Sequence, residues 1–130
     1  MSWWKGNDNA TDSADGNNGT LQNGATFAAG RFEQAFSLDG SNDVASIPDA
    51  ANLDFGPTAP LSVEVWALRT SPNPIMHLVG KRDGTGINYQ LALNTNSGQG
   101  LVFGSAASGR DLPLNVWTHL VGTFDGSLFR

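Results

Sequence analysis

Hydrophobic and polar residues alternate along much of the chain after residue 34, which is the pattern of half-buried β-strands. The clearest case is the segment 61–69, with the sequence LSVEVWALR. Its odd positions give an apolar face: Leu61, Val63, Val65 and Ala67. Its even positions give a mixed face: Glu64, Trp66 and Leu68. Because both faces carry apolar residues, the segment predicts a strand in a sheet that is covered on both sides, as in a sandwich.

Further short strands are expected at residues 20–22, 35–38, 44–48, 75–81, 89–93, 101–103 and 117–124. Turn signals separate them, namely Asn18-Gly19, Asn23-Gly24, Asp39-Gly40, Asp83-Gly84 and Asp125-Gly126. No amphipathic helix or internal repeat is evident, and nothing helical separates the strands after residue 61. The pattern therefore predicts an all-β fold, an antiparallel β-sandwich of jelly-roll type, and excludes strand–helix–strand units.

The first part of the chain, residues 6–30, is polar and dense in turn-forming residues, so disorder is one interpretation. Four apolar residues are nevertheless spaced through or just before it: Trp3, Trp4, Leu21 and Phe27. Residues of this kind usually anchor loops to a core. We therefore expect an ordered, turn-rich segment.

Composition narrows the class of protein. A chain of 130 residues fits one domain, 1–130, and 16 glycines with only 15% charged residues suit short strands joined by tight loops. The net charge of -5 makes nucleic acid a poor partner, because phosphate binding needs clustered basic residues. The chain has no cysteine, no signal-peptide pattern after Met1 and no apolar stretch long enough for membrane insertion.

Three segments occur in an order that resembles one family. They are NNGTLQNGATFAAGRFEQAFSLDGSNDVASIP at residues 17–48, LSVEVWALR at 61–69 and NVWTHLVGTFDGS at 115–127. Together they resemble the bacterial laminin-G-like domains of the concanavalin A-like lectin/glucanase superfamily. The resemblance implies a jelly-roll sandwich with an extracellular or cell-surface recognition role, binding glycans or proteins, or serving as a spacer in a larger surface protein.

The resemblance also implies strands beyond the Asp125-Gly126 turn, whereas the chain ends at Arg130. The fold is therefore expected to be incomplete at its C-terminus. Exposed edge strands pair readily with other chains, so a homo-oligomer formed through them is one expectation and an unstable protein is the other.

Carboxylates and amides cluster in two loops, one around Asp12 and Asp15 and one around Asp39 and Asp43. Calcium prefers hard oxygen ligands in flexible loops, which makes these four acids candidate ligands. The family resemblance implies a rim calcium held largely by backbone carbonyls, completed by a C-terminal Asp that this chain lacks. The alternative is that these side chains only form turns.

Carbohydrate recognition needs aromatic faces and planar polar groups. Tyr89, flanked by Asn88 and Gln90 and followed by Asn94, is the candidate ligand-binding set. Trp66 and Trp117 lie within predicted strands, so core packing is the preferred interpretation for both.

Catalysis is not expected. Glucanases of this fold carry paired acids in a pattern like ExDxxE, whereas Glu64 has Trp66 and Leu68 at the partner positions. His77 and His119 lack zinc-site spacing, and His119 is expected to be packed and hydrogen-bonded. The sequence thus predicts a non-catalytic module that binds glycan or protein, with calcium as an optional cofactor. The alternatives are a structural, self-assembling sandwich and a degenerate β-glucanase.

Overall fold

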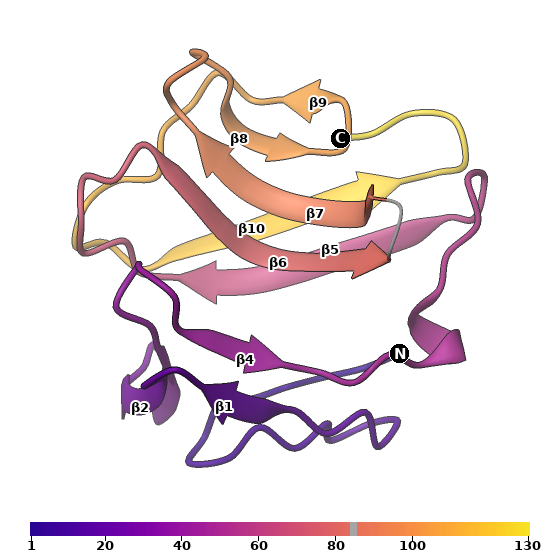
Figure 1. Cartoon of the computed structure of the whole chain (residues 1–130). Helices are drawn as coiled ribbons and strands as arrows, with labels where there is room; N and C mark the ends of the chain where they lie inside the picture. The colour runs from indigo at the N-terminus through magenta and orange to yellow at the C-terminus, as the bar shows by residue number, and fades with distance from the viewer. Residues whose placement is uncertain (84–85) are drawn as a thin grey trace. The chain divides into compact units, whose positions relative to one another are not determined.

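The computed structural model describes the backbone of residues 1–83 and 86–130, and the side chains outside 83–87. Within these limits the chain forms ten β-strands and one short 3-10 helix, Ala51–Leu53. It divides into two compact units, here called unit 1 (Met1–Leu53) and unit 2 (Asp54–Arg130). Every paired strand is antiparallel (Figure 1), which confirms the predicted all-β antiparallel fold.

Unit 1 contains two small sheets. Strand β1 (Thr20–Gln22) pairs with β4 (Val44–Ser46), and β2 (Thr26–Ala29) pairs with β3 (Gln34–Ser37). The predicted Asn23-Gly24 turn joins β1 to β2, and both of its residues have positive φ, as such tight turns require. The Phe27 and Phe36 rings face each other across the second sheet, with centroids 5.6 Å apart.

Unit 2 contains a two-stranded sheet and a four-stranded sheet. Strand β5 (Leu61–Ala67) pairs with β10 (Thr118–Phe124) along its whole length, from Leu61 opposite Phe124 to Ala67 opposite Thr118. The second sheet has the order β6-β7-β8-β9, with bounds Ile75–Asp83, Gly86–Asn94, Gly100–Phe103 and Ala106–Ala107. Figure 1 shows the two sheets as separate layers of unit 2.

The core of unit 2 lies between these layers. Its buried members are Leu91, Leu93, Phe103, Leu112, Leu120 and Phe124. The predicted apolar face of segment 61–69 packs against them: Leu61, Val63, Val65 and Ala67. The face that carries these four residues is therefore the inward face of β5.

Two tryptophan assignments need correction. Trp66 is not in the core: it lies on the outer face of β5, 39% exposed, with its ring stacked on His119 at 5.0 Å between centroids. Trp117 is half-buried and precedes β10, which begins at Thr118. Because both faces of this strand carry apolar residues, its sequence does not show which face is buried. In the structure, the face that carries Val63 packs against the core.

The Asp83-Gly84 turn includes Gly84, which lies outside the described residues. The assignment of 1–130 to a single domain stays a prediction. In the described part of the chain, no helix has the length and apolar character needed to cross a membrane.

Candidate functional site

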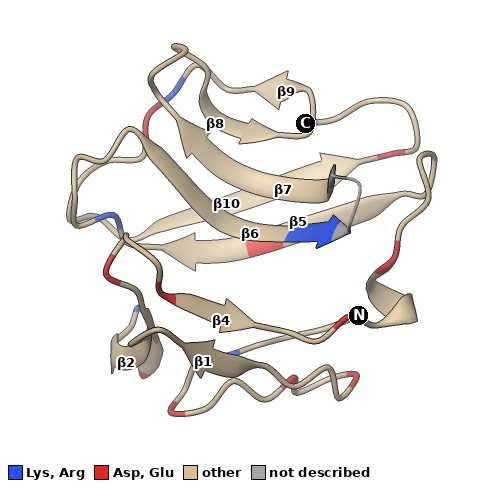
Figure 2. Cartoon of the chain, in the orientation of Figure 1, with Lys and Arg blue, Asp and Glu red and all other residues tan. Residues whose placement is uncertain are grey.

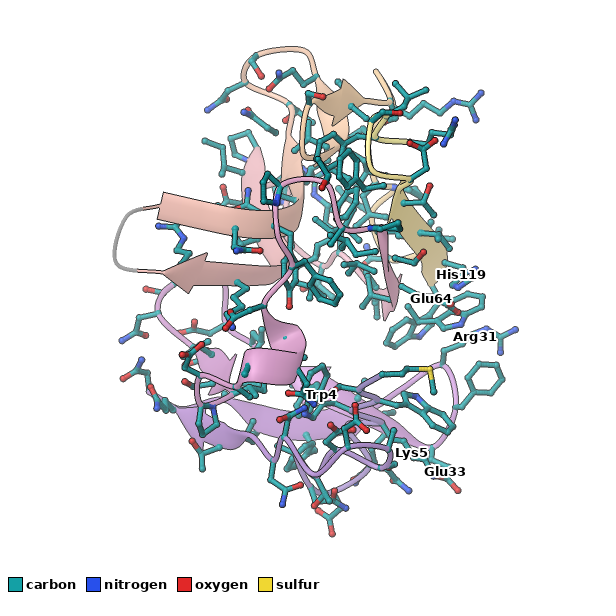
Figure 3. All side chains as sticks on the ribbon, turned by 90° about the vertical axis from the view of Figure 1, so that its right-hand side faces the viewer. Trp4, Lys5, Arg31, Glu33, Glu64 and His119 are labelled. Carbon is teal, nitrogen blue, oxygen red and sulfur yellow. The ribbon has the colours of Figure 1, made fainter. Side chains whose placement is uncertain are left out.

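A hollow of about 290 Å³ opens at one end of unit 2. The ends of three strands meet there: the start of β5, the end of β10 and the start of β7. Its lining is mostly aromatic and apolar: Phe55, Gly56, Pro57, Leu61, Asn88, Tyr89, Phe124 and Phe129. Figure 3 views unit 2 from the side on which these ends lie in Figure 1. A concave, largely apolar site with a few polar groups is the usual form of a ligand pocket.

Two aromatic pairs form its walls. Phe55 and Tyr89 meet edge to face, with ring centroids 5.6 Å apart and planes at 73°. Phe124 and Phe129 stack at 4.2 Å and 21°. Both arrangements are favourable ring geometries, and together they give the hollow preformed hydrophobic surface.

The second pair depends on the last residues of the chain, which fold back onto β10. Thr123 and Arg130 exchange backbone hydrogen bonds of 2.9 and 2.8 Å, which places Phe129 beside Phe124. Asp125 holds this return: its Oδ1 accepts from the backbone N–H groups of Ser127 and Leu128 and its Oδ2 from Arg130. These hydrogen bonds hold the pKa of Asp125 well below its usual range, so the carboxylate stays ionised.

A charged pair lies beside Tyr89. Lys81, directly opposite Tyr89 in the β6–β7 pairing, forms an ion pair with Asp54. The Lys81 side chain is only 11% exposed, whereas that of Asp54 is 54% exposed. Burial raises the pKa of Tyr89, with opposing contributions from Lys81 and Asp54, so its hydroxyl stays protonated at neutral pH. Figure 2 shows basic residues at the end of β6 that lies opposite Tyr89.

The predicted ligand-binding set divides between two places. Tyr89 and Asn88 line the hollow. Gln90 is half-buried and is not part of the lining, and Asn94 lies at the opposite end of β7, hydrogen-bonded to Gln99 at 3.3 Å. Their closeness in sequence does not bring them together, because a strand separates its ends by about 3.3 Å per residue.

Asp12, the first predicted calcium ligand, is 5% exposed and organises the N-terminal loop. Its Oδ1 accepts from the backbone N–H groups of Trp3 and Ala14 at 2.8 and 3.0 Å, and its Oδ2 accepts from Asn17 at 3.1 Å. Burial alone raises the pKa of Asp12, but these donors, with the Ser2 hydroxyl, bring it well below the usual range. Both oxygens thus serve the turn.

Asp15 lies in the same loop but makes different contacts. Its Oδ2 pairs with the N-terminal ammonium of Met1 at 2.6 Å and accepts from Asn52 at 3.3 Å. It therefore ties the chain start to the 3-10 helix of unit 1.

Asp39 and Asp43 do come together. The Asp39 backbone N–H donates to Asp43 Oδ2 at 3.0 Å, and Asp39 Oδ1 accepts from Ser41. Asp43 Oδ1 is buried without a hydrogen-bond partner among the described residues, beside Gly24. Across the part of the chain that the structure describes, no group of three or more acidic, His or Cys side chains gathers in metal-binding range.

Glu64 and His119 form a separate polar cluster on the outer face of the β5–β10 sheet. Glu64 Oε1 lies 2.8 Å from His119 Nε2, as the side-by-side placement in Figure 3 shows. The register places Glu64 opposite Val121 and His119 opposite Trp66. The outer face of these two strands holds no second carboxylate, since its other members are Ser62, Val121 and Thr123. The hydrogen bond expected for His119 is thus made to Glu64.

Sequence reasoning missed most of the hollow. Phe55 is an isolated aromatic in a loop, Phe129 follows the last strand, and Lys81 reads as a solvent-facing strand residue. The sequence did single out Tyr89 and Asn88 as ligand-binding residues, and it placed Leu61 and Phe124 in predicted strands.

A protein-family model described as the Concanavalin A-like lectin/glucanases superfamily matches residues 39–130. No curated protein and no solved structure matches the chain. The matched range includes the whole lining of the hollow, Asp39, Asp43 and Glu64, and excludes Asp12 and Asp15.

Proposed function

The chain belongs to the concanavalin A-like lectin/glucanase superfamily, and we propose that it is a non-catalytic recognition module that binds a glycan in the hollow of unit 2. The observation that carries the proposal is the combination of preformed aromatic walls with polar groups at their edge. Tyr89 contributes a ring and a hydroxyl, and Asn88 contributes an amide. Sugars present C–H faces that pack on aromatic rings and hydroxyls that need such partners.

The absence of catalysis is part of the proposal. Glycoside hydrolysis requires two carboxyl groups about 5–9.5 Å apart, one on each side of the scissile bond. Glu64 is hydrogen-bonded to His119, and the described outer face of its sheet supplies no second acid. Asp54, beside the hollow, is ion-paired with Lys81.

We also propose a calcium ion at the corner formed by Asp39 and Asp43. The support is Asp43 Oδ1, a buried carboxylate oxygen without a described hydrogen-bond partner, in a turn whose carbonyl groups are suitable hard ligands. Calcium added after EDTA treatment raises the melting temperature if it binds only the folded state. An unchanged melting temperature, with Asp43→Asn behaving like wild type, removes calcium from the proposal.

The family favours an extracellular or cell-surface setting of bacterial type for such a module, and we propose that setting here. A protein ligand and self-association through edge strands are the competing functions. Light scattering after size exclusion tests self-association. A stable oligomer that binds no glycan would indicate a structural element rather than a recognition module.

The direct test is a glycan array followed by calorimetry on each hit, with wild type and Tyr89→Ala compared. Binding that Tyr89→Ala abolishes supports a lectin-like module. A blank array, repeated with calcium present, contradicts glycan binding and leaves a protein ligand or a structural role.

A further inference from the structure

We infer that the hollow of unit 2 takes a single uncharged sugar ring, the terminal ring of a glycan, seated in the corner between Phe55 and Tyr89. The inference rests on the proposed function and goes beyond it by naming the part of the glycan and its charge class. Size, wall geometry and the polar groups each contribute a separate argument.

The hollow is small, and core residues line its inner side. Its volume of about 290 Å³ lies at the lower limit of ligand pockets, which run from about 300 to 1,000 Å³. Its floor is the core itself, because Phe124 is a buried core residue and Leu61 packs against that core. A glycan can enter only from the open side, and the small volume leaves room for its end rather than for a run of rings.

The walls suit one ring. Phe55 and Tyr89 stand at 73° to each other, which makes a corner with one aromatic face on each side. A pyranose has one predominantly C–H face, which packs on one aromatic surface while its edge meets the other. The two rings do not form a flat, extended aromatic surface of the kind that binds several consecutive sugar rings.

The polar groups favour an uncharged ligand. Sugar hydroxyls both donate and accept, and the lining offers both functions through the Tyr89 hydroxyl and the Asn88 amide. Recognition of a uronic or sialic acid needs an available cation, whereas Lys81 beside Tyr89 is ion-paired with Asp54.

The test measures binding to the full chain by saturation-transfer NMR and calorimetry. The probes are methyl glycosides of neutral hexoses, the matching uronic acids, and neutral oligosaccharides of increasing length. Neutral methyl glycosides should bind, uronic acids should bind more weakly, and affinity should not grow with chain length. Loss of one hydrogen bond in Tyr89→Phe should weaken binding by about 2- to 10-fold, and loss of the ring in Tyr89→Ala by more than about 10-fold.

The matched control is Trp66→Ala, which removes a partly exposed ring on the outer face of the same unit. It should bind like wild type. Binding that survives Tyr89→Ala and Phe55→Ala but is lost in Trp66→Ala overturns the inference and leaves glycan recognition standing. Affinity that rises with chain length, or a preference for uronic acids, also overturns it. If no carbohydrate binds wild type at all, the proposed function itself fails. A circular dichroism melt of each variant shows whether that variant is folded.

Discussion

Replacing Arg69 by Lys should destabilise unit 2 while leaving the formal charge unchanged. Arg69 follows β5, and its side chain is only 5% exposed. Its guanidinium donates to the backbone carbonyls of Ser71 (2.8 Å), Asn73 (3.0 Å) and Leu112 (3.1 Å), and to Asp111 Oδ1 at 2.5 Å. One planar group thus joins the segment after β5 to the loop before β10.

The magnitude follows from the geometry. An ammonium is a point donor on a flexible chain and cannot reproduce a planar fork aimed in several directions, so we expect it to keep about two of the four bonds. Each lost bond costs about 1 kcal/mol net, which gives about 2 kcal/mol for Arg69→Lys. The Asp111 side chain is 56% exposed, so its ion pair adds little beyond its hydrogen bond. Arg69→Met loses all four bonds and should cost about 4 kcal/mol.

The assay is thermal and urea unfolding followed by circular dichroism. For a chain of 130 residues, about 2 kcal/mol corresponds to a fall in melting temperature of about 6–12 °C. Arg110→Lys is the matched control, because Arg110 is exposed in the same loop, and it should change stability by less than about 0.5 kcal/mol. An Arg69→Lys melting temperature within about 1 or 2 °C of wild type would refute the assignment of Arg69 as the group that joins the two segments.

Three further results are expected. Gly122→Ala should lose about 1–3 kcal/mol in urea unfolding, because its Cβ would stand 2.5 Å from the Phe103 ring, whereas Gly56→Ala, with open space, should be neutral. Asp12 has a lowered pKa when folded, so its contribution to stability is complete above the ordinary aspartate pKa of 3.8 and is lost as the pH falls through the lowered pKa. Asp12→Asn should therefore make stability less dependent on pH in this acid range. Wild type should release no reducing sugar from β-glucans, and release abolished by Glu64→Gln would contradict the non-enzyme proposal.

The strands of this fold were predictable because strand periodicity is local. Alternation over 61–69 identified β5, and the Asn23-Gly24 dipeptide identified a turn in which both residues have positive φ. Strands β2 (Thr26–Ala29) and β9 (Ala106–Ala107) were not predicted. The first lies in the segment that was expected to be turn-rich, and the second has two residues, which are too few to show a period. Trp66 was misplaced for a different reason: the alternation defines two faces but does not say which one is buried.

The candidate site was much less predictable, because its contacts join residues far apart in sequence. Phe55 meets Tyr89 only after β5 and β6 have been placed, and Lys81 meets Asp54 for the same reason. Tyr89 was proposed as a ligand-binding residue on the strength of its polar neighbours, and it does line the hollow. The reason differs, since its ring is on the inward face of β7 with Leu91, at the edge of the core.

The residues that line the hollow come partly from the core and partly from surface loops. The hollow is shaped by two loops, 54–60 and 125–127, which lie against each other where Gly126 approaches the Thr58 carbonyl. Its floor belongs to the core and cannot change without loss of stability, whereas a Cβ at Gly56 would meet nothing within 4 Å. Substitutions in the outer loops can therefore alter ligand preference while leaving the sandwich intact. A larger side chain at position 56 should narrow the hollow, and it should reduce sugar affinity without lowering the melting temperature. A fall in both together would mean that the hollow is packing space that stabilises the end of the sandwich.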